Sequence, residues 1–285
     1  MILVTGATGS NGSELTKLLA SRSVPVRAMA RSRDGAKAIA ALAGVEVVIG
    51  DFDDPASVER ALRGVEKAFL LTNSSERAEA RQRAFVDTAR RTGLKHIVKL
   101  SQFAADEASP VRFLRYHAAV ERAIVESGIA YTFLRPNLFM QGLLAFRGPI
   151  ASQGKFFAAA GDAKVSVVDV RDNATAAAAA LTGPGHEGRT YDLTGPEALT
   201  HAQMAATLSG ALGRPLAFVD VPPEAMRDAL LDAGMPLWQA DGLVEDYAHY
   251  RRGEASAVAP GVRDVTGEPP RAFSAFARDY APAVS

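Results

Sequence analysis

Three glycines near the amino terminus constrain most strongly what this chain can fold into. Gly6, Gly9 and Gly12 directly follow the apolar run 2–4 and directly precede an amphipathic stretch that begins near Glu14. A strand, a glycine-rich turn and a helix in this order are typical of the first βα junction of a dinucleotide-binding sheet, where helix N–H groups hold a pyrophosphate. A tight turn without any ligand is the alternative interpretation. The position of the turn at the first βα junction favours the nucleotide site.

Short β-rich runs alternate with longer helical patterns over the first half of the chain. The predicted strands are residues 2–5, 24–30, 46–49, 67–71, 96–100 and 130–134. The predicted helices are residues 12–21, 35–43, 55–63, 76–91 and 110–127. The strands are almost continuously apolar, as in a parallel sheet covered on both faces. This pattern predicts an α/β protein with a doubly wound parallel sheet, the Rossmann fold.

The pattern changes after Pro136, where glycine and proline interrupt the chain more often. A short strand is predicted at 165–168, an alanine-rich helix at 173–181, and a surface loop at 260–270. Thr200 and Gln203 have the spacing of a helix capping box, and Gly213 has the position of a C-terminal cap. We therefore predict a dinucleotide-binding domain over 1–136, its sheet completed by segments within 160–195, and a smaller C-terminal α/β substrate lobe over 137–285.

The composition indicates a folded protein, because 48% of the 285 residues are apolar and 22% are charged. Acidic and basic residues balance at 32 each, so we expect no nucleic-acid partner and no membrane partner. The charged stretch 77–91 is typical of a solvated helix face. We find no secretory signal, no apolar run of about 20 residues and no cysteine, a combination that favours the cytoplasm. Five scattered histidines predict no metal site.

The second predicted strand ends in a basic segment that bears on cofactor choice. Proteins that prefer NAD carry an acid here, which bonds the ribose 2′-hydroxyl, whereas this chain has Arg31, Ser32 and Arg33. Guanidinium groups bind phosphate with two parallel hydrogen bonds, and a serine hydroxyl adds a donor. The segment predicts NADP(H) in preference to NAD(H). One of the two arginines is alternatively a solvated loop residue.

Polar and small residues follow the other predicted strands, at the edge of the sheet where ligands bind in open α/β folds. Asp51 and Phe52 are placed to contact an adenine, although Asp53 or Asp54 before Pro55 also fits a helix N-cap. The remaining residues that we expect to contact the cofactor lie in the glycine turn and after the first, fourth, fifth and sixth strands: Gly6, Thr8, Gly9, Ser10, Asn11, Gly12, Leu71, Thr72, Asn73, Ser101, Gln102, Pro136 and Asn137.

Several of these segments together resemble a known family. They are the glycine turn 5–12, Arg31, the pair 50–51, Ser101, His117 with Glu121, the run 127–136 and the segment 191–195. With these motifs the chain resembles the NmrA-like branch of atypical short-chain dehydrogenases and reductases over nearly its whole length. Within that branch it is most similar to bacterial NADPH-dependent quinone oxidoreductases and triphenylmethane reductases. The isoflavone-reductase branch has a catalytic lysine at the position of His117, so the resemblance does not imply its chemistry.

The chain lacks the acid–base pair of ordinary short-chain dehydrogenases. In that pair a lysine follows a tyrosine by four residues and lowers the pKa of the phenol, and no tyrosine here has such a lysine. Oxidation of alcohols and epimerisation of sugar nucleotides are therefore disfavoured. His117 is the candidate proton donor, with Glu121 one turn away to hold its ring, or else the two form a surface pair without a catalytic role. Phe139, Met140 and Trp238 are the candidate substrate-pocket residues, with core packing as the alternative.

Together these features predict an NADPH-dependent oxidoreductase that transfers hydride to a quinone-like or other conjugated small molecule. A regulatory protein that senses NADP(H) without turnover is the alternative. We expect a small-molecule electron acceptor as the partner, and a monomer or a homodimer.

Overall fold

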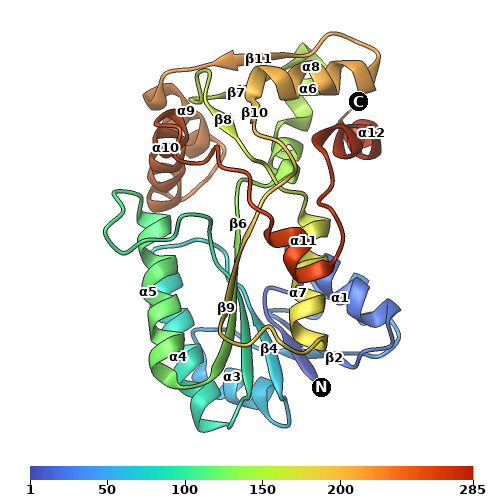
Figure 1. Cartoon of the computed structure of the whole chain (residues 1–285), viewed down its shortest axis with the longest axis vertical. Coiled ribbons are helices and arrows are strands. Elements are labelled where there is room, and N and C mark those ends of the chain that lie inside the picture. The colour runs from blue at the N-terminus through green and yellow to red at the C-terminus, as the bar shows by residue number, and fades with distance from the viewer. Residues whose placement is uncertain (285) are drawn as a thin grey trace.

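A seven-stranded sheet, parallel throughout, forms the centre of the molecule. Figure 1 shows it in a computed structural model, which describes residues 1–284. The strand order is β3-β2-β1-β4-β5-β6-β9. The strands are β1 Ile2–Val4, β2 Val26–Ala30, β3 Val45–Ile49, β4 Lys67–Leu70, β5 His96–Leu100, β6 Ala130–Pro136 and β9 Arg189–Leu193. The order reverses between β1 and β4, so the doubly wound fold is confirmed.

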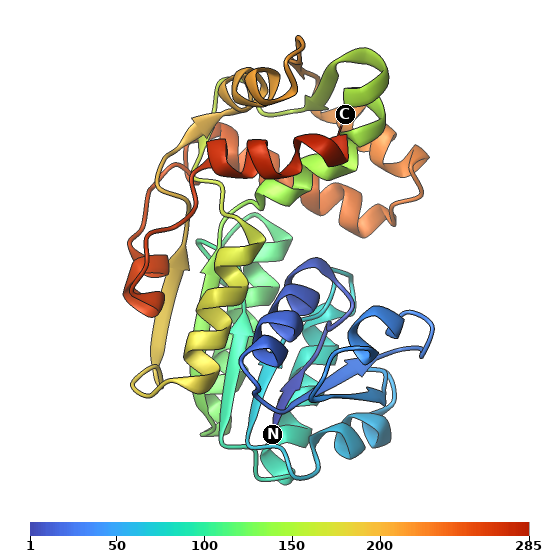
Figure 2. The same cartoon turned by 90° about the vertical axis from the view of Figure 1, so that its right-hand side faces the viewer.

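Helices cover both faces of this sheet. On one face α1 Ser10–Ser21 packs against α7 Val170–Thr182, with α2 Lys37–Ala40 and α11 Gly261–Thr266 beside them. The other face carries α3 Pro55–Leu62, α4 Ala78–Arg91 and α5 Arg112–Ser127. Figure 2 shows α1 and α7 in front of the sheet. Within the alanine run 176–180 of α7, all residues except Ala179 are buried. Their small side chains let α7 approach α1 closely.

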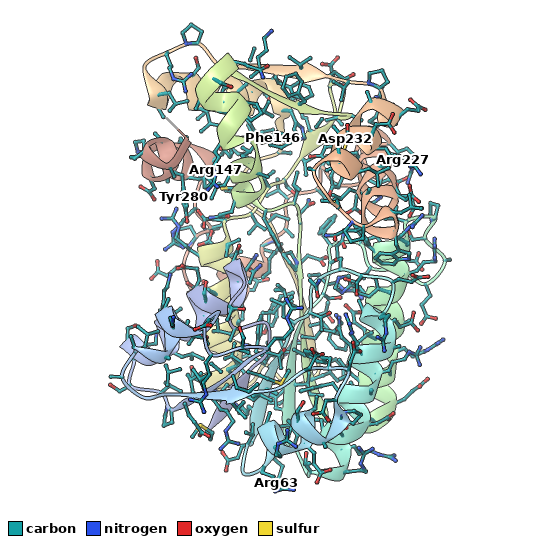
Figure 3. All side chains as sticks on the ribbon, turned by 180° about the vertical axis from the view of Figure 1, so that it is seen from behind. Arg63, Phe146, Arg147, Arg227, Asp232 and Tyr280 are labelled. Atoms are coloured by element: carbon teal, nitrogen blue, oxygen red, sulfur yellow. The ribbon has the colours of Figure 1, made fainter. Side chains whose placement is uncertain are left out.

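A smaller lobe lies beyond the carboxyl ends of the strands, at the top of Figure 1. Its core contains Phe156, Met204 and Phe276. It has two small sheets, one with β7 and β11 in parallel and one with β8 and β10 antiparallel. Its elements are η1 Met140–Phe146, α6 Arg147–Gln153, β7 Lys155–Ala158, β8 Lys164–Val165, β10 Leu199–Thr200, α8 His201–Leu212, β11 Ala217–Asp220, α9 Pro223–Asp232, α10 Leu237–Arg251 and α12 Phe273–Val284. In Figure 3 Arg147 and Tyr280 lie on one side of this lobe, Arg227 on the other, and Arg63 at the far end of the molecule.

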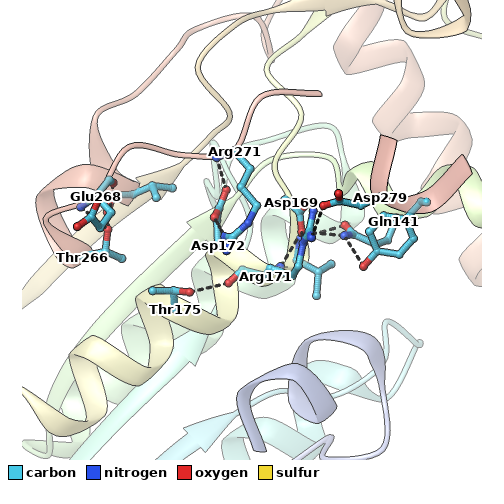
Figure 4. A network of polar contacts seen from close by, with 12 residues as sticks. Gln141, Asp169, Arg171, Asp172, Thr175, Thr266, Glu268, Arg271 and Asp279 are labelled. Carbon is cyan, nitrogen blue, oxygen red and sulfur yellow. Dashed lines mark hydrogen bonds and ion pairs between the residues drawn. The ribbon is translucent and has the colours of Figure 1, made fainter. Parts of the chain in front are cut away.

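The chain passes repeatedly between the sheet and the lobe. It returns from β8 to form α7 and β9, and returns again after α10 to form α11, which packs on α7 and β9. Figure 4 shows ion pairs at these passages. Arg171 bonds Asp169 at 2.7 Å and Asp279 of α12 at 2.6 Å, and Arg271 bonds Asp172 of α7. The Arg171–Asp279 pair joins α7 to the last helix of the chain, and the Arg271–Asp172 pair joins α7 to the segment that leads into that helix.

Several local predictions are confirmed and three are wrong. The capping box of Thr200 and Gln203 is present, and Gly213 ends α8 in the left-handed conformation with φ 64°. The strand predicted at 165–168 is limited to Lys164–Val165, and the helix predicted at 35–43 is limited to Lys37–Ala40. The predicted loop 260–270 contains α11, because Val262 and Val265 bury one helical face against the sheet. The division of the chain near residue 136 stays a prediction.

Among residues 1–284, every helix is too short or too polar to cross a bilayer.

Candidate functional site

The glycine turn brings the start of α1 against the end of β1. Gly6 has φ +60°, a conformation that favours glycine, and a Cβ on Gly12 would lie 2.2 Å from the carbonyl oxygen of Gly6. The side chain of Thr5 joins the turn to the end of β4. Its Oγ1 donates to the carbonyl oxygen of Phe69 at 3.0 Å and accepts from the N–H of Leu71 at 2.9 Å. No side chain caps α1 at its amino end. The first N–H groups of α1 therefore remain available for an anion.

A cavity of about 410 Å³ opens in front of this turn, and we name it the glycine-loop cavity. Its walls come from the carboxyl ends of β1, β2, β3 and β4 and the start of α1. Predicted residues in its lining are Gly6, Thr8, Gly9, Ser10, Asn11, Arg31, Asp51, Phe52, Leu71, Thr72, Asn73 and Phe139. Asn173 of α7 fixes the side chain of Asn11, because Oδ1 of Asn11 accepts a hydrogen bond from Nδ2 of Asn173 at 3.1 Å.

Of the basic segment after β2, Arg31 lines the glycine-loop cavity, whereas Ser32 and Arg33 are exposed outside its lining. Ser32 instead accepts a hydrogen bond from the N–H of Gly35 at 3.2 Å. Gly12 also lies outside the lining and serves the close packing of the turn described above. Arg31 is thus the one member of this segment within reach of a ligand in the cavity.

The three carboxylates of the acidic segment after β3 make different contacts. Asp54 caps α3 by accepting from the N–H of Ala56, and Asp51 lines the glycine-loop cavity. Asp53 bonds Arg81, which also lines the cavity, at 2.6 Å. The hydrogen bond from Arg81 holds the pKa of Asp53 below its usual value. Arg81 could not be predicted as a site residue, because the stretch 77–91 has the composition of a solvated helix face.

A second cavity of about 540 Å³ lies between the sheet and the lobe, and we name it the interlobe cavity. It shares the residues Ser10, Leu71, Thr72, Asn73 and Phe139 with the glycine-loop cavity, so the two adjoin. The ends of β5 and β6 contribute the predicted residues Ser101, Gln102, Pro136 and Asn137, and α5 contributes His117. The opposite wall is α10, which contributes Gln239, Leu243, Asp246, His249 and Tyr250.

His117 lies in the interlobe cavity but not in the surroundings that we predicted. It is buried, and its Nδ1 lies 2.9 Å from Nζ of Lys99. Glu121 does not hold its ring, because that carboxylate accepts two hydrogen bonds from Arg135, one of them at 2.9 Å. The prediction of a His117–Glu121 contact, catalytic or on the surface, is therefore wrong. Burial, together with the positive charges of Lys99 and Arg135, keeps the pKa of His117 well below its usual value, so the imidazole is neutral.

Two further polar groups of the interlobe cavity are buried. Asp246 accepts from Nε2 of Gln102 with both carboxylate oxygens, and burial raises the pKa of Asp246 to about 7. The hydroxyl of Ser101 has no hydrogen-bond partner among the described residues. Buried polar atoms are ordinarily paired, so an unpaired hydroxyl on a cavity wall indicates a ligand atom or a water molecule.

Two predicted pocket residues lie elsewhere. Met140 is buried in the core of the lobe, because its N–H bonds Val168 and turns the chain into η1. Trp238 packs against Phe113 behind the cavity wall, and the guanidinium of Arg112 lies over its ring. Neither residue lines the glycine-loop cavity or the interlobe cavity, so the structure does not bring either of them to the predicted pocket. Phe139, the third of them, lies where the two cavities meet.

The residues present fit a dinucleotide. The glycine turn leaves no room for side chains at Gly6 and Gly12, the start of α1 offers N–H groups, and Arg31 offers a positive charge at one end of the glycine-loop cavity. Among residues 1–284, no group of three or more His, Asp or Glu side chains comes together as metal ligands would.

Comparison with known proteins agrees with this geometry. The NmrA-like family matches residues 1–260. An NAD(P)H azoreductase of Xenophilus azovorans is 38% identical over 99% of both chains. A (4-alkanoyl-5-oxo-2,5-dihydrofuran-3-yl)methyl phosphate reductase of Streptomyces griseus is 41% identical, again over 99% of both. The crystal structure of an NADPH-dependent quinone oxidoreductase of Escherichia coli, complexed with NADPH, has a TM-score of 0.87 at 30% identity and covers 98% of this chain and 99% of that one. The chain therefore belongs to the NmrA-like family, as its motifs predicted, and is an oxidoreductase.

Proposed function

We propose that this protein is an NADPH-dependent reductase of conjugated small molecules such as quinones. The observation that carries the proposal is the continuity of the two cavities, which meet at Phe139. One cavity has the features of a dinucleotide site and the other has apolar and aromatic walls. A cofactor and an electron acceptor bound in adjoining cavities are held next to each other, which lowers the entropic part of the barrier.

The preference for NADPH rests on Arg31. This guanidinium lines the glycine-loop cavity at the end of β2, where a cofactor with a 2′-phosphate carries two more negative charges. No carboxylate stands at the end of β2 itself for a free 2′-hydroxyl, and the next one, Asp34, is exposed and pairs with Lys37 outside the glycine-loop cavity. NADPH, when bound, supplies the hydride, and the protein supplies position and a dry environment.

The acceptor class rests on the walls of the interlobe cavity. Phe103, Phe113, Tyr116 and Tyr250 line it, as is typical of sites for flat aromatic ligands. The three related enzymes named above act, by their names, on an azo compound, an unsaturated lactone phosphate and a quinone, and each of these is conjugated. Conjugated acceptors stabilise the added charge themselves and need less help from an acid or base.

Epimerase or alcohol dehydrogenase chemistry of the ordinary short-chain type finds no tyrosine–lysine pair in this cavity. Tyr116 and Tyr250 line it, but burial raises the pKa of both phenols above the usual value. The hydroxyl of Tyr116 is bonded to Ser74 at 3.1 Å, and no lysine follows either tyrosine by four residues. A phenol with a raised pKa is a poor proton donor and is not ionised at neutral pH.

The test is acceptor-dependent oxidation of NADPH against a panel of quinones, azo dyes and unsaturated lactones. We expect turnover with at least one class, and a decrease of roughly 10–100-fold in kcat for His117→Ala with unchanged affinity for NADPH. His186→Ala is the control, since His186 bonds Tyr191 away from both cavities. Tight NADPH binding without turnover on any acceptor would favour the sensor of NADP(H) instead.

A further inference from the structure

Lys99 is an ionisable residue near the carboxyl end of β5, with a fully buried side chain. Its Nζ lies 2.9 Å from Nδ1 of His117 and donates to the carbonyl oxygen of Leu100 at 3.3 Å. Among residues 1–284, it forms no ion pair. The carboxylate charge that raises the pKa of Lys99 is that of Glu121, which Arg135 already binds.

A lysine at this position weakens the sheet that it belongs to. The other residues of β5 are buried as well, and an apolar side chain would fill the space of Lys99 without the free energy of desolvating an ammonium group. Burial lowers the pKa of Lys99 to about 7; Glu121 of α5 acts in the opposite direction, and Arg135 of β6 adds to the lowering. A buried group that loses and regains its proton near neutral pH, in contact with a cavity residue, has the properties of a functional site.

The contact between Lys99 and His117 determines which imidazole nitrogen carries the proton. A charged ammonium has only donors, so Nδ1 of His117 accepts from it and the ring proton is on Nε2. His117 lines the interlobe cavity, and its Nε2 has no hydrogen-bond partner among the described residues. The cavity thus presents an N–H donor from a neutral ring.

We propose that Lys99 positions His117 as an N–H donor to the acceptor and supplies the proton that the reduced acceptor takes up. This inference rests on the proposed function and names the proton source of that reaction. It also narrows the substrate class to conjugated molecules with a carbonyl oxygen or an azo nitrogen, because such an atom accepts the hydrogen bond before reduction and the proton afterwards.

The proton transfers balance without any charge on the imidazole. Hydride addition leaves an anionic oxygen or nitrogen on the acceptor, and the bond from that atom to the Nε2 proton forms as the Nε2–H bond breaks. In the same step the Nδ1–H bond forms as the ammonium of Lys99 loses a proton and becomes a neutral amine. After product release, Nε2 takes a proton from solvent as Nδ1 returns its proton to Lys99, and the starting state is restored.

The tautomer of His117 is the first test, because it does not depend on turnover. Nitrogen-15 NMR at about pH 6, where Lys99 is charged, should show His117 as the Nε2–H form in the wild type, with His117→Gln identifying the signal. Lys99→Met should lose this single form, whereas the control Lys95→Met, at an exposed position, should keep it. A wild-type protein with its proton on Nδ1 would overturn the proposal even if Lys99→Met failed to fold.

Kinetics give the second test. Acceptor-dependent kcat of the wild type should fall as the pH rises through about 7, where Lys99 loses its proton, and Lys99→Met should be roughly 10–100-fold slower at pH 6 without that step. The affinity for NADPH should be the same in both. A triarylmethyl cation takes hydride on carbon and needs no proton, so the ratio of quinone to dye turnover should fall in Lys99→Met.

The outcomes separate this inference from the proposed function. Normal wild-type turnover with an unchanged Lys99→Met rate and pH profile overturns the relay and leaves the reductase in place. If NMR shows the Nε2–H form of His117 but no acceptor is reduced, the protein is not a reductase of these molecules, and the proposed proton transfer is refuted with it.

Discussion

Nε2 of Gln102 lies 3.1 Å from each carboxylate oxygen of Asp246, and this contact joins the end of β5 to α10 across the interlobe cavity. The carboxyl group is fully buried, and its pKa is raised to about 7, so at acidic pH it is neutral in the folded protein. The hydrogen bonds from Gln102 favour the ionised carboxylate and lower its pKa, but burial outweighs them, so below about pH 7 the folded protein holds Asp246 in its protonated form.

The pH dependence of stability follows from the sign of this shift. An unfolded aspartate ionises near pH 4, so between about pH 4 and pH 7 the unfolded state holds fewer protons and the free energy of unfolding falls as the pH rises. Asp246→Asn removes this dependence. From pH 5 to pH 8 the wild type should therefore lose roughly 1–3 kcal/mol of unfolding free energy relative to the Asp246→Asn variant. Urea unfolding at several pH values measures it, and a difference independent of pH would contradict the raised pKa.

Replacing Arg31 with Ala should change cofactor selection. The loss of a charge-assisted contact with the 2′-phosphate should weaken NADPH binding roughly 10–100-fold and NADH binding by less than about threefold. Arg33→Ala is the matched control, because that residue lies outside the glycine-loop cavity, and it should affect neither cofactor. Fluorescence titration with both nucleotides provides the dissociation constants. An equal loss for NADPH and NADH would remove Arg31 as the determinant.

Gly12→Ala tests the packing of the glycine turn. The added Cβ would meet the carbonyl oxygen of Gly6 at 2.2 Å, so either the turn or α1 must move. We expect a destabilisation of roughly 1–3 kcal/mol and weaker binding of both nucleotides. Gly210→Ala provides the comparison within α8, where no atom lies within 4 Å of the new Cβ, and should stabilise the protein by roughly 0.4–1 kcal/mol. Thermal unfolding and nucleotide titration on both variants distinguish a local clash from a general effect of replacing glycine.

Arg171 should matter more to stability than its ion-pair partner Asp279. Asp169 is fully buried, and although burial opposes its ionisation, hydrogen bonds from Arg171 and Gln141 hold its pKa below the usual value. Arg171→Met leaves this carboxylate poorly compensated and should cost roughly 2–4 kcal/mol. Asp279 is about half exposed, so Asp279→Asn should change the free energy of unfolding by less than about 1 kcal/mol. Denaturant unfolding of the two variants would refute this account if their effects were equal.

The sheet and the glycine turn could be predicted because their signals are local. Strands such as β1 and β4 are short and mostly apolar runs, and Gly6 and Gly12 lie at the spacing that the turn needs. The helix α11 was missed because only Val262 and Val265 reveal its buried face within a segment rich in glycine and proline. The local composition is that of a loop, but burial of these two valines against the sheet stabilises a helix there.

The cofactor side of the site was easier to predict than the acceptor side for the same reason. Arg31 and Asp51 follow strands directly, so the order of elements places them at one edge of the sheet. Lys99 and His117 are 18 residues apart on a strand and a helix, and only the packing of α5 on β5 brings their nitrogens together. Similarly, the way α10 faces α5 puts Asp246 in the cavity and Trp238 behind it.

The repeated passage of the chain between the sheet and the lobe also bears on how a small molecule enters. The connections after β6, before α7, after β9, and on either side of α11 all cross the same boundary. A domain that swings on one hinge has few such connections, whereas here every one of them would have to bend together. We therefore expect the walls of the interlobe cavity to keep their spacing, so that the width of an acceptor, rather than closure around it, decides which molecules are reduced.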